Sequence, residues 1–281
     1  MPIYEQTYRR YEARAPLTRF RFWPITREAL RLVLMKRAFL GLLALSFLPF
    51  IVRVVQVYVV TRFPEAGRVL PVDGRMFGEF LNQQVGFTLL LTIFGGAGLV
   101  ANDLRTGAIV MYLARPLTRR DYVLGKLGTT LLLNLAVTLA PGLLLYGVAL
   151  ALAPDQFAKW ELAWIPPAIV VQAFTMSLCV SLLGLAVSSL TKSARVSGLA
   201  FSAFIAGLEL VRQVLDHGFD RPEATLLSVQ DNLRNLSRAL FGLGERGATM
   251  PWPASAAVLL ALAFGCLLVL RRRVRAVEIV S

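Results

Sequence analysis

The sequence has few of the residue types that make metal or redox centres. Its 281 residues include one histidine, His217, and two cysteines, Cys179 and Cys266. It contains no H-x-x-x-H or C-x-x-C spacing, so we do not expect a metal site built from these ligands. Both cysteines lie inside long apolar runs, which argues against a disulfide framework.

The sequence also lacks a phosphate-binding loop of the form G-x-x-x-x-G-K-[ST]. Its only Gly-Lys pair, Gly125-Lys126, is followed by Leu127, and Arg120 stands where the first glycine belongs. The apolar runs hold neither a nucleophile with a base nor paired carboxylates. We therefore expect no bound cofactor, no ATP site and no catalytic centre, which excludes most enzyme classes.

Long apolar runs dominate what is present. Hydrophobic residues make up 56 % of the chain, and its mean hydropathy is +0.62. A run of about 18 or more apolar residues is long enough to cross the ~30 Å hydrocarbon core as a helix. The sequence thus predicts an all-α polytopic membrane protein with an N-terminal segment 1–37, a six-span domain 38–270 and a basic tail 271–281. The six predicted transmembrane helices are residues 38–60, 83–101, 127–153, 164–190, 197–214 and 252–270.

The net charge of +13 is distributed unevenly between the two sides of this predicted topology. The segments on the side of the N-terminus hold about two thirds of the 30 lysines and arginines but only about a third of the 17 acidic residues. This is the pattern of the positive-inside rule and predicts that both termini are cytoplasmic, in the plasma or bacterial inner membrane. The basic face requires no nucleic acid, because membrane lipids with anionic headgroups are sufficient partners.

Two helices are predicted outside the spans. Residues 25–37, with Thr26 as N-cap, read as an interfacial helix on the inner surface, or alternatively as an N-terminal extension of the first span. Between spans 5 and 6 a stretch with apolar residues at alternating three- and four-residue spacing predicts an amphipathic external helix. Its apolar face comprises Leu226, Val229, Leu233, Leu236 and Leu240.

Polar and small residues within the spans are further candidate sites. Arg53 lies well inside the first span, where its side chain either extends toward the outer interface, pairs with Glu209 or lines a cavity. Ala194, Gly198, Ser202 and Ala206 recur at four-residue spacing, which fits a helix–helix seam or a lipid-facing stripe equally well.

The connection 102–126 between spans 2 and 3 has a defined local pattern. Asp103 is a candidate N-cap for a helix over 104–114, and Pro116 should end that helix. Thr118 and Asp121 have the spacing of a capping box at the start of the next helix, and Lys126 could anchor its inner end. A basic loop that only sets topology would not need these signals.

This connection resembles that of ABC-2-type permeases, the membrane subunits of ABC exporters. Those proteins carry an acidic residue, a glycine, Pro-x-x-Arg and a lysine after the second span. The resemblance, which extends to six spans and an N-terminal basic helix, implies that the connection is a coupling helix for a separate ATPase. The implied ATPase-coupling residues are Asp103, Leu104, Gly107, Ala108, Met111, Tyr112, Pro116, Arg119 and Lys126, with secondary contacts at Thr191, Lys192 and Arg195.

The resemblance also implies partners. Two cytoplasmic ATPase subunits would bind ATP and Mg²⁺, and a second permease copy would complete a homodimer or heterodimer. Arg53, Gly198, Ser202, Ala206 and Glu209 are then candidates for the pathway or dimer seam, and the external helix is a candidate docking site for an extracytoplasmic partner protein. The alternative function is a membrane anchor or assembly protein that does not transport.

Overall fold

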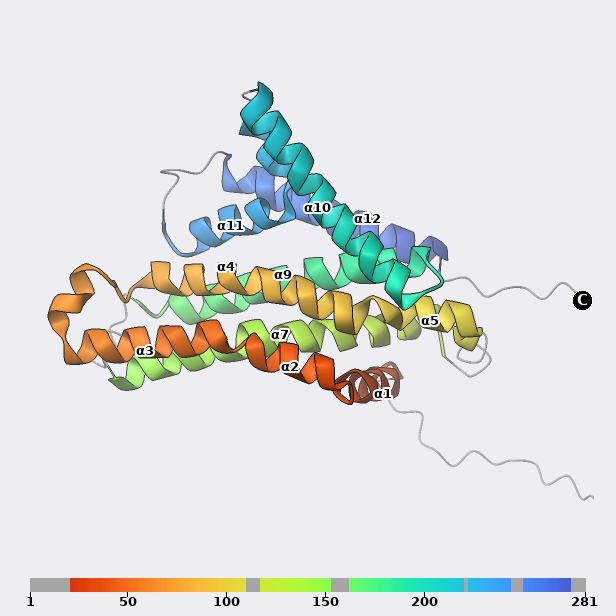
Figure 1. Ribbon diagram of the computed structural model, residues 1–281, viewed down its shortest axis with the longest axis horizontal. Coiled ribbons are helices and arrows are strands. Elements are labelled where there is room, and N and C mark those ends of the chain that lie inside the picture. The colour runs from red at the N-terminus through yellow and green to blue at the C-terminus, as the bar shows by residue number, and fades with distance from the viewer. Residues whose placement is uncertain (1–20, 110–116, 153–161, 220–221, 244–249, 274–281) are drawn as a thin grey trace, which may run out of the picture.

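The computed structural model describes residues 21–109, 117–152, 162–219, 222–243 and 250–273. All regular secondary structure within these ranges is helical (Figure 1). By length and composition, six helical segments could cross a membrane, as the hydropathy predicted. They are Arg37–Arg62, Gly74–Thr106, Arg119–Leu152, Ile165–Leu190, Ala194–Asp216 and Trp252–Arg273.

A separate helix precedes the first span. Helix α1 (Trp23–Leu34) ends before Lys36, whose extended backbone begins α2 (Arg37–Leu45), so α1 is not an extension of that span. Thr26 lies inside α1 and is not its N-cap. Its hydroxyl instead donates to the backbone oxygen of Gly125 over 2.9 Å, which fixes α1 to another helix, α7 (Arg119–Leu152).

The first span is interrupted near its middle. Helix α2 ends at Leu45, and α3 (Leu48–Arg62) begins three residues later, with Pro49 in its first turn. The break frees the backbone oxygen of Ser46, which accepts a hydrogen bond from Nε2 of Gln84 over 3.0 Å. A buried amide on the second span thereby satisfies a backbone group that the helix itself leaves unpaired.

The second span starts earlier and ends later than the predicted 83–101. Helix α4 (Gly74–Leu91) is capped by Asp73, whose carboxylate accepts from the backbone N–H groups of Arg75 and Met76. A π-helical turn, η2 (Thr92–Gly96), joins it to α5 (Gly98–Thr106). The first turns of α4 contain polar residues, and hydropathy therefore did not include them in the predicted span.

The glycine-rich end of the second span brings helices close together. A Cβ atom on Gly95 would lie 2.9 Å from the Phe39 ring, and one on Gly96 would lie 2.9 Å from Cγ2 of Thr130. Asn134 of α7 donates to the hydroxyl oxygens of Thr92 and of Ser181 on α9 (Ile165–Leu190), each over 3.1 Å. The π turn is therefore held among three spans.

The spans differ in the fraction of their residues that is buried by the rest of the chain. In the apolar window of α9, 72 % of residues are buried, against 11 % for α2–α3 and 17 % for α10 (Ala194–Phe219). Figure 1 shows α10 and α12 (Trp252–Arg273) crossing over one side of the bundle. Helices α9 and α4 thus form the centre, and α2–α3 and α10 lie at the periphery.

The segments that follow the first and fifth spans pack against the bundle. The short helix η1 (Pro64–Arg68) follows α3, and η4 (Pro222–Leu227) precedes the amphipathic helix α11 (Val229–Leu240). The N-cap of α11 is Ser228, so the helix starts later than the predicted Leu226, and the positive φ of Gly242 follows its end. Leu233 is fully buried, and its backbone oxygen accepts from Nε2 of Gln172 over 3.0 Å.

Candidate functional site: the junction between α5 and α7

The junction begins where α5 ends. Gly107 has a φ of 69°, a left-handed conformation that ends the helix after Thr106. Asp103 therefore lies inside the last turns of α5, and the predicted helix over 104–114 with Asp103 as its N-cap is wrong. Residues 108–109 are helical again beyond the glycine, whereas the predicted coupling residues Met111, Tyr112 and Pro116 lie outside the described residues.

Asp103 has a different role from capping. Its Oδ2 atom lies 2.7 Å from Nζ of Lys126 and accepts a hydrogen bond from the Tyr122 hydroxyl over 2.8 Å. The side chain of Lys126 is 6 % exposed and that of Asp103 is 16 % exposed. A charge pair this well screened from water is costly to break, because the remaining charge would be buried without a partner. Lys126 thus joins α7 to α5.

The start of α7 is built as the sequence predicted. The backbone N–H and hydroxyl of Thr118 both donate to Oδ2 of Asp121, over 2.9 and 2.8 Å, and the backbone N–H of Asp121 donates to Oγ1 of Thr118 over 3.2 Å. This is the reciprocal arrangement of a capping box. It fixes the direction in which α7 leaves the junction.

A small apolar cluster fills the inside of the junction. Ile109 and Tyr122 are buried, and Leu104 and Val123 pack against them half-buried. Leu104 therefore points toward α7. Between Arg105 and Arg120, the exposed residues that the structure describes are polar or small: Arg105, Thr106, Gly107, Thr118, Arg119 and Arg120.

Helix α5 is also fixed to α9. The hydroxyl of Ser188 donates to the backbone oxygen of Ala97 over 2.6 Å and accepts from the backbone N–H groups of Val100 and Ala101 over 3.2 and 3.0 Å. These bonds satisfy backbone groups at the π turn. Ser188 lies in a predicted span and Tyr122 in the predicted connection, and neither has a local sequence signal. Only the packing of the helices reveals them as parts of this junction.

The predicted secondary contact lies beside the same helix. Thr191 is extended and ends α9, and Lys192 and Arg195 are exposed. A Cβ atom on Gly98 at the start of α5 would lie 3.0 Å from Cβ of Ala194. The structure therefore brings the α9–α10 turn close to α5.

The small-residue stripe of α10 packs within the chain along its first half. A Cβ atom on Gly198 would lie 3.3 Å from Cγ2 of Ile93, so this glycine faces the π turn. Ser202 is half-buried and its hydroxyl donates to the backbone oxygen of Gly198, whereas Ala206 is exposed. The stripe is thus an intramolecular seam at one end and open at the other.

Arg53 and Glu209 do not pair with each other, which corrects one of the predicted alternatives. The guanidinium of Arg53 donates to Gln56 Oε1 over 2.8 Å and lies 3.4 Å from Oε2 of Glu79, at the edge of a cavity of about 400 Å³. Glu209 accepts from Arg212, 2.7 Å away. Glu79 belongs to a turn of α4 that the sequence had assigned to a loop, so it was not considered as the partner.

Among the described residues, no cluster of three or more His, Cys, Asp or Glu side chains could hold a metal ion. The junction has a polar outer surface, and an ion pair and hydrogen bonds fix it to α7 and α9.

A helical bundle with six candidate spans is the architecture of a polytopic membrane protein. A family model described as "ABC-2 family transporter protein" matches residues 23–270. The chain therefore belongs to the ABC-2 transporter family, and is a membrane subunit of a transporter and not its ATPase. The curated proteins contain no relative that matches it.

Proposed function

We propose that this chain is the permease subunit of an ATP-driven exporter and that the α5–α7 junction couples it to cytoplasmic ATPase subunits. The family carries the general assignment. The observation that supports the coupling role is the linkage of α5 to α7 through Asp103 and Lys126 and to α9 through Ser188. A displacement applied to the junction would move three spans together.

The surface that would contact the ATPase is the polar side of the junction. Arg105, Gly107 and Arg119 are exposed there, while Leu104 points inward. Lys192 and Arg195 of the α9–α10 turn would add the secondary contact. We therefore assign Asp103, Leu104 and Lys126 to holding the junction in shape, and the exposed residues to binding.

The assembly would contain two ATPase subunits, which supply ATP and Mg²⁺, and two permease copies. The poor coverage of α2–α3 and α10 by the chain's own residues favours these spans as surfaces for a second copy. The positive-inside rule favours cytoplasmic termini in the plasma or bacterial inner membrane. Helix α11 would then face outside, where it could meet an extracytoplasmic partner.

The proposal is tested by co-expressing the chain with its ATPase and measuring co-purification and membrane-dependent ATP hydrolysis. Arg105→Glu and Arg119→Glu should each reduce both, because they place a negative charge on the proposed contact surface. Arg68→Glu, an exposed change on η1 outside the junction, is the matched control and should reduce neither.

Two results would count against coupling at this junction. One is full ATPase binding and hydrolysis in the Arg105→Glu and Arg119→Glu variants. The other is stable assembly in which the ATPase never responds to the permease, which would favour the alternative of a membrane anchor.

A further inference from the structure

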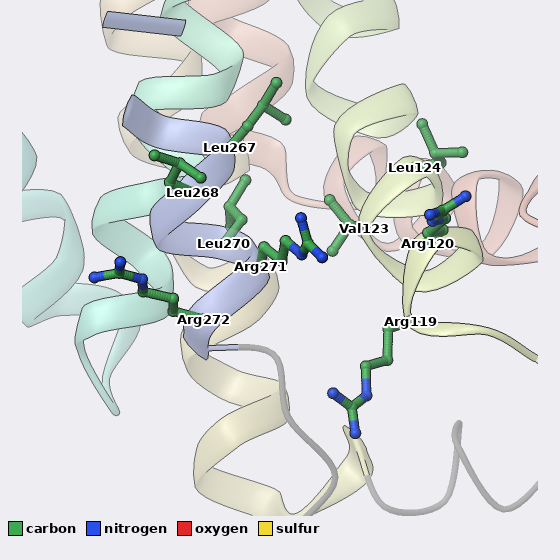
Figure 2. Close-up of a pocket in the computed structure, with 9 residues that line it drawn as sticks. All are labelled: Arg119, Arg120, Val123, Leu124, Leu267, Leu268, Leu270, Arg271 and Arg272. Atoms are coloured by element: carbon green, nitrogen blue, oxygen red, sulfur yellow. The ribbon is translucent and has the colours of Figure 1, made fainter. Parts of the chain in front are cut away.

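A second feature of the basic face is a cavity between the start of α7 and the end of α12. Its volume is about 800 Å³. Figure 2 shows it between the two helices, with Arg271 extending from α12 toward Val123 on α7. The lining residues are Arg119, Arg120, Val123, Leu124, Leu267, Leu268, Leu270, Arg271 and Arg272.

The wall of this cavity is apolar and open. Leu270 is buried at 2 % exposure, whereas Leu124, Leu267 and Leu268 are 49 %, 45 % and 38 % exposed. These leucines belong to two apolar spans, so the surface they expose faces the hydrocarbon side of the membrane. Such a wall is suited to contact with an alkyl chain.

The rim of the cavity is basic and uncompensated. Within the described parts of the chain, no carboxylate lies within ion-pair distance of Arg119, Arg120, Arg271 or Arg272. Asp121, which follows Arg120 in sequence, accepts hydrogen bonds from the backbone N–H and the hydroxyl of Thr118. The arginines place positive charge at the edge of the cavity, which a bound anion would neutralise.

We propose that this cavity binds one anionic phospholipid from the leaflet at the basic face. The phosphate lies among Arg120, Arg271 and their neighbours, because a planar guanidinium donates two parallel hydrogen bonds to phosphate oxygens. An acyl chain covers Leu124 and Leu267, about one helical turn deeper in the membrane. Basic cavities between transmembrane helices are a recognised type of site for acidic headgroups.

The two kinds of lining select an amphiphile over other anions. A free phosphate or an acidic protein surface could neutralise the arginines, but neither would cover the exposed leucines. The site adjoins the proposed ATPase contact, because Arg119 and Arg120 are exposed at the junction and also line the cavity. Lipid binding is therefore measured without an ATPase present.

The experiment counts lipids bound to the full chain in mild detergent by native mass spectrometry. The probes are phosphatidylglycerol and phosphatidylcholine with identical acyl chains, together with the soluble headgroup glycerophosphoglycerol. One phosphatidylglycerol should bind more tightly than any phosphatidylcholine. Arg120→Gln/Arg271→Gln should weaken that binding by about tenfold or more, because two charge-assisted contacts are lost.

The matched control is Arg37→Gln/Arg273→Gln, which removes two exposed arginines of the basic face that do not line the cavity. It should retain the tight phosphatidylglycerol, and unchanged phosphatidylcholine binding in both variants verifies that the fold is intact. The proposal is overturned if both lipids bind equally, if the control pair loses as much as the cavity pair, or if the soluble headgroup binds as tightly as the lipid.

Discussion

At the scale of single residues, the carboxylate of Asp103 makes two of the contacts that hold the junction together. It forms an ion pair with Lys126 and accepts a hydrogen bond from the Tyr122 hydroxyl, and it is mostly screened from water. Desolvation opposes this arrangement, and the attraction between the two charges offsets it only while both are present. The pair is therefore a better determinant of helix position than of overall stability.

The first prediction concerns this pair. Lys126→Met leaves a buried carboxylate without its countercharge and should destabilise the chain by about 3–5 kcal/mol. The double change Asp103→Leu/Lys126→Met removes both charges and should recover most of that loss. Thermal unfolding of the purified chain in detergent, followed by circular dichroism, measures both. Equal losses in the single and double variants would show that the two charges do not interact.

The partner of Arg53 illustrates what sequence reasoning could not reach at this scale. Arg53 was recognised as a costly charge within a span, but its partner Glu79 and its acceptor Gln56 depend on how α3 and α4 pack. Glu79 lay in a segment whose polar residues looked like a loop. Which side chains meet between two helices depends on how the helices pack, and the hydropathy of one segment contains no information on that packing.

At the scale of elements, α1 is held against α7 by a close backbone approach. A Cβ atom on Gly125 would lie 2.8 Å from Cβ of Ile25 and 3.1 Å from the backbone oxygen of Phe22. The hydroxyl of Thr26 accordingly reaches the Gly125 oxygen. Glycine is needed here because of the neighbouring helix, since no positive φ requires it.

This close approach gives the second prediction. Gly125→Ala should push α1 away from α7 and cost about 1–3 kcal/mol through overpacking. Gly147→Ala, on the same helix but with nothing within 4 Å of the added methyl group, is the control and should be neutral or slightly stabilising. Thermal unfolding again gives the difference. If the two variants melted alike, α1 would not be packed on α7 at this glycine.

The elements also show where sequence patterns are sufficient. The capping box at Thr118 and the amphipathic helix α11 were predicted because their signals lie within a few consecutive residues. The helix over 104–114 was predicted wrongly because Asp103 can serve equally as a cap or as an ion-pair partner. Only the position of Lys126 on the neighbouring helix decides between these roles.

At the scale of the whole molecule, the proposed orientation can be measured by chemical labelling. Cys179 and Cys266 are buried, and both are replaced so that the background is silent. A cysteine in place of Arg234, whose side chain is 56 % exposed on α11, should react with a membrane-impermeant maleimide in intact cells.

The control for this third prediction is Arg105→Cys at the junction, which should react only after the cells are opened. The opposite pattern would invert the assigned topology and move the proposed ATPase surface to the outside. Labelling of both positions in intact cells would show that the membrane barrier was not intact, and the measurement would be repeated on sealed vesicles.

The fourth prediction concerns assembly. If the open end of the α10 stripe forms the seam between two copies, Ala206→Cys should form an intermolecular disulfide in oxidised membranes. Leu260→Cys, on α12 at a position where the leucine is 72 % exposed, is the control and should remain monomeric on a non-reducing gel. Crosslinking at both positions would indicate random collision, and crosslinking only at residue 260 would place the seam elsewhere.

The number of spans was predictable from the sequence because each span is defined by the length and hydropathy of its own segment. The layout of those spans was not, since it depends on contacts between residues far apart in the chain. Ser188 on α9, for example, bonds to backbone groups of α5 that only a π turn leaves free. Nothing in the sequence around Ser188 distinguishes it from a lipid-facing serine.

The π turn at Thr92–Gly96 also sets the rotational phase of the second span. A turn closed by a bond from the backbone N–H of Ala97 to the oxygen of Thr92 contains one residue more than an α-helical turn. Every side chain beyond it is consequently rotated by about 100° around the helix axis. If the same residues closed as an α-helical turn, the apolar run would keep its length but Asp103 would point away from Lys126. Deleting one residue from the turn would instead restore a regular α-helix and keep the direction of Asp103. The π turn thus determines which face of α5 is directed toward α7.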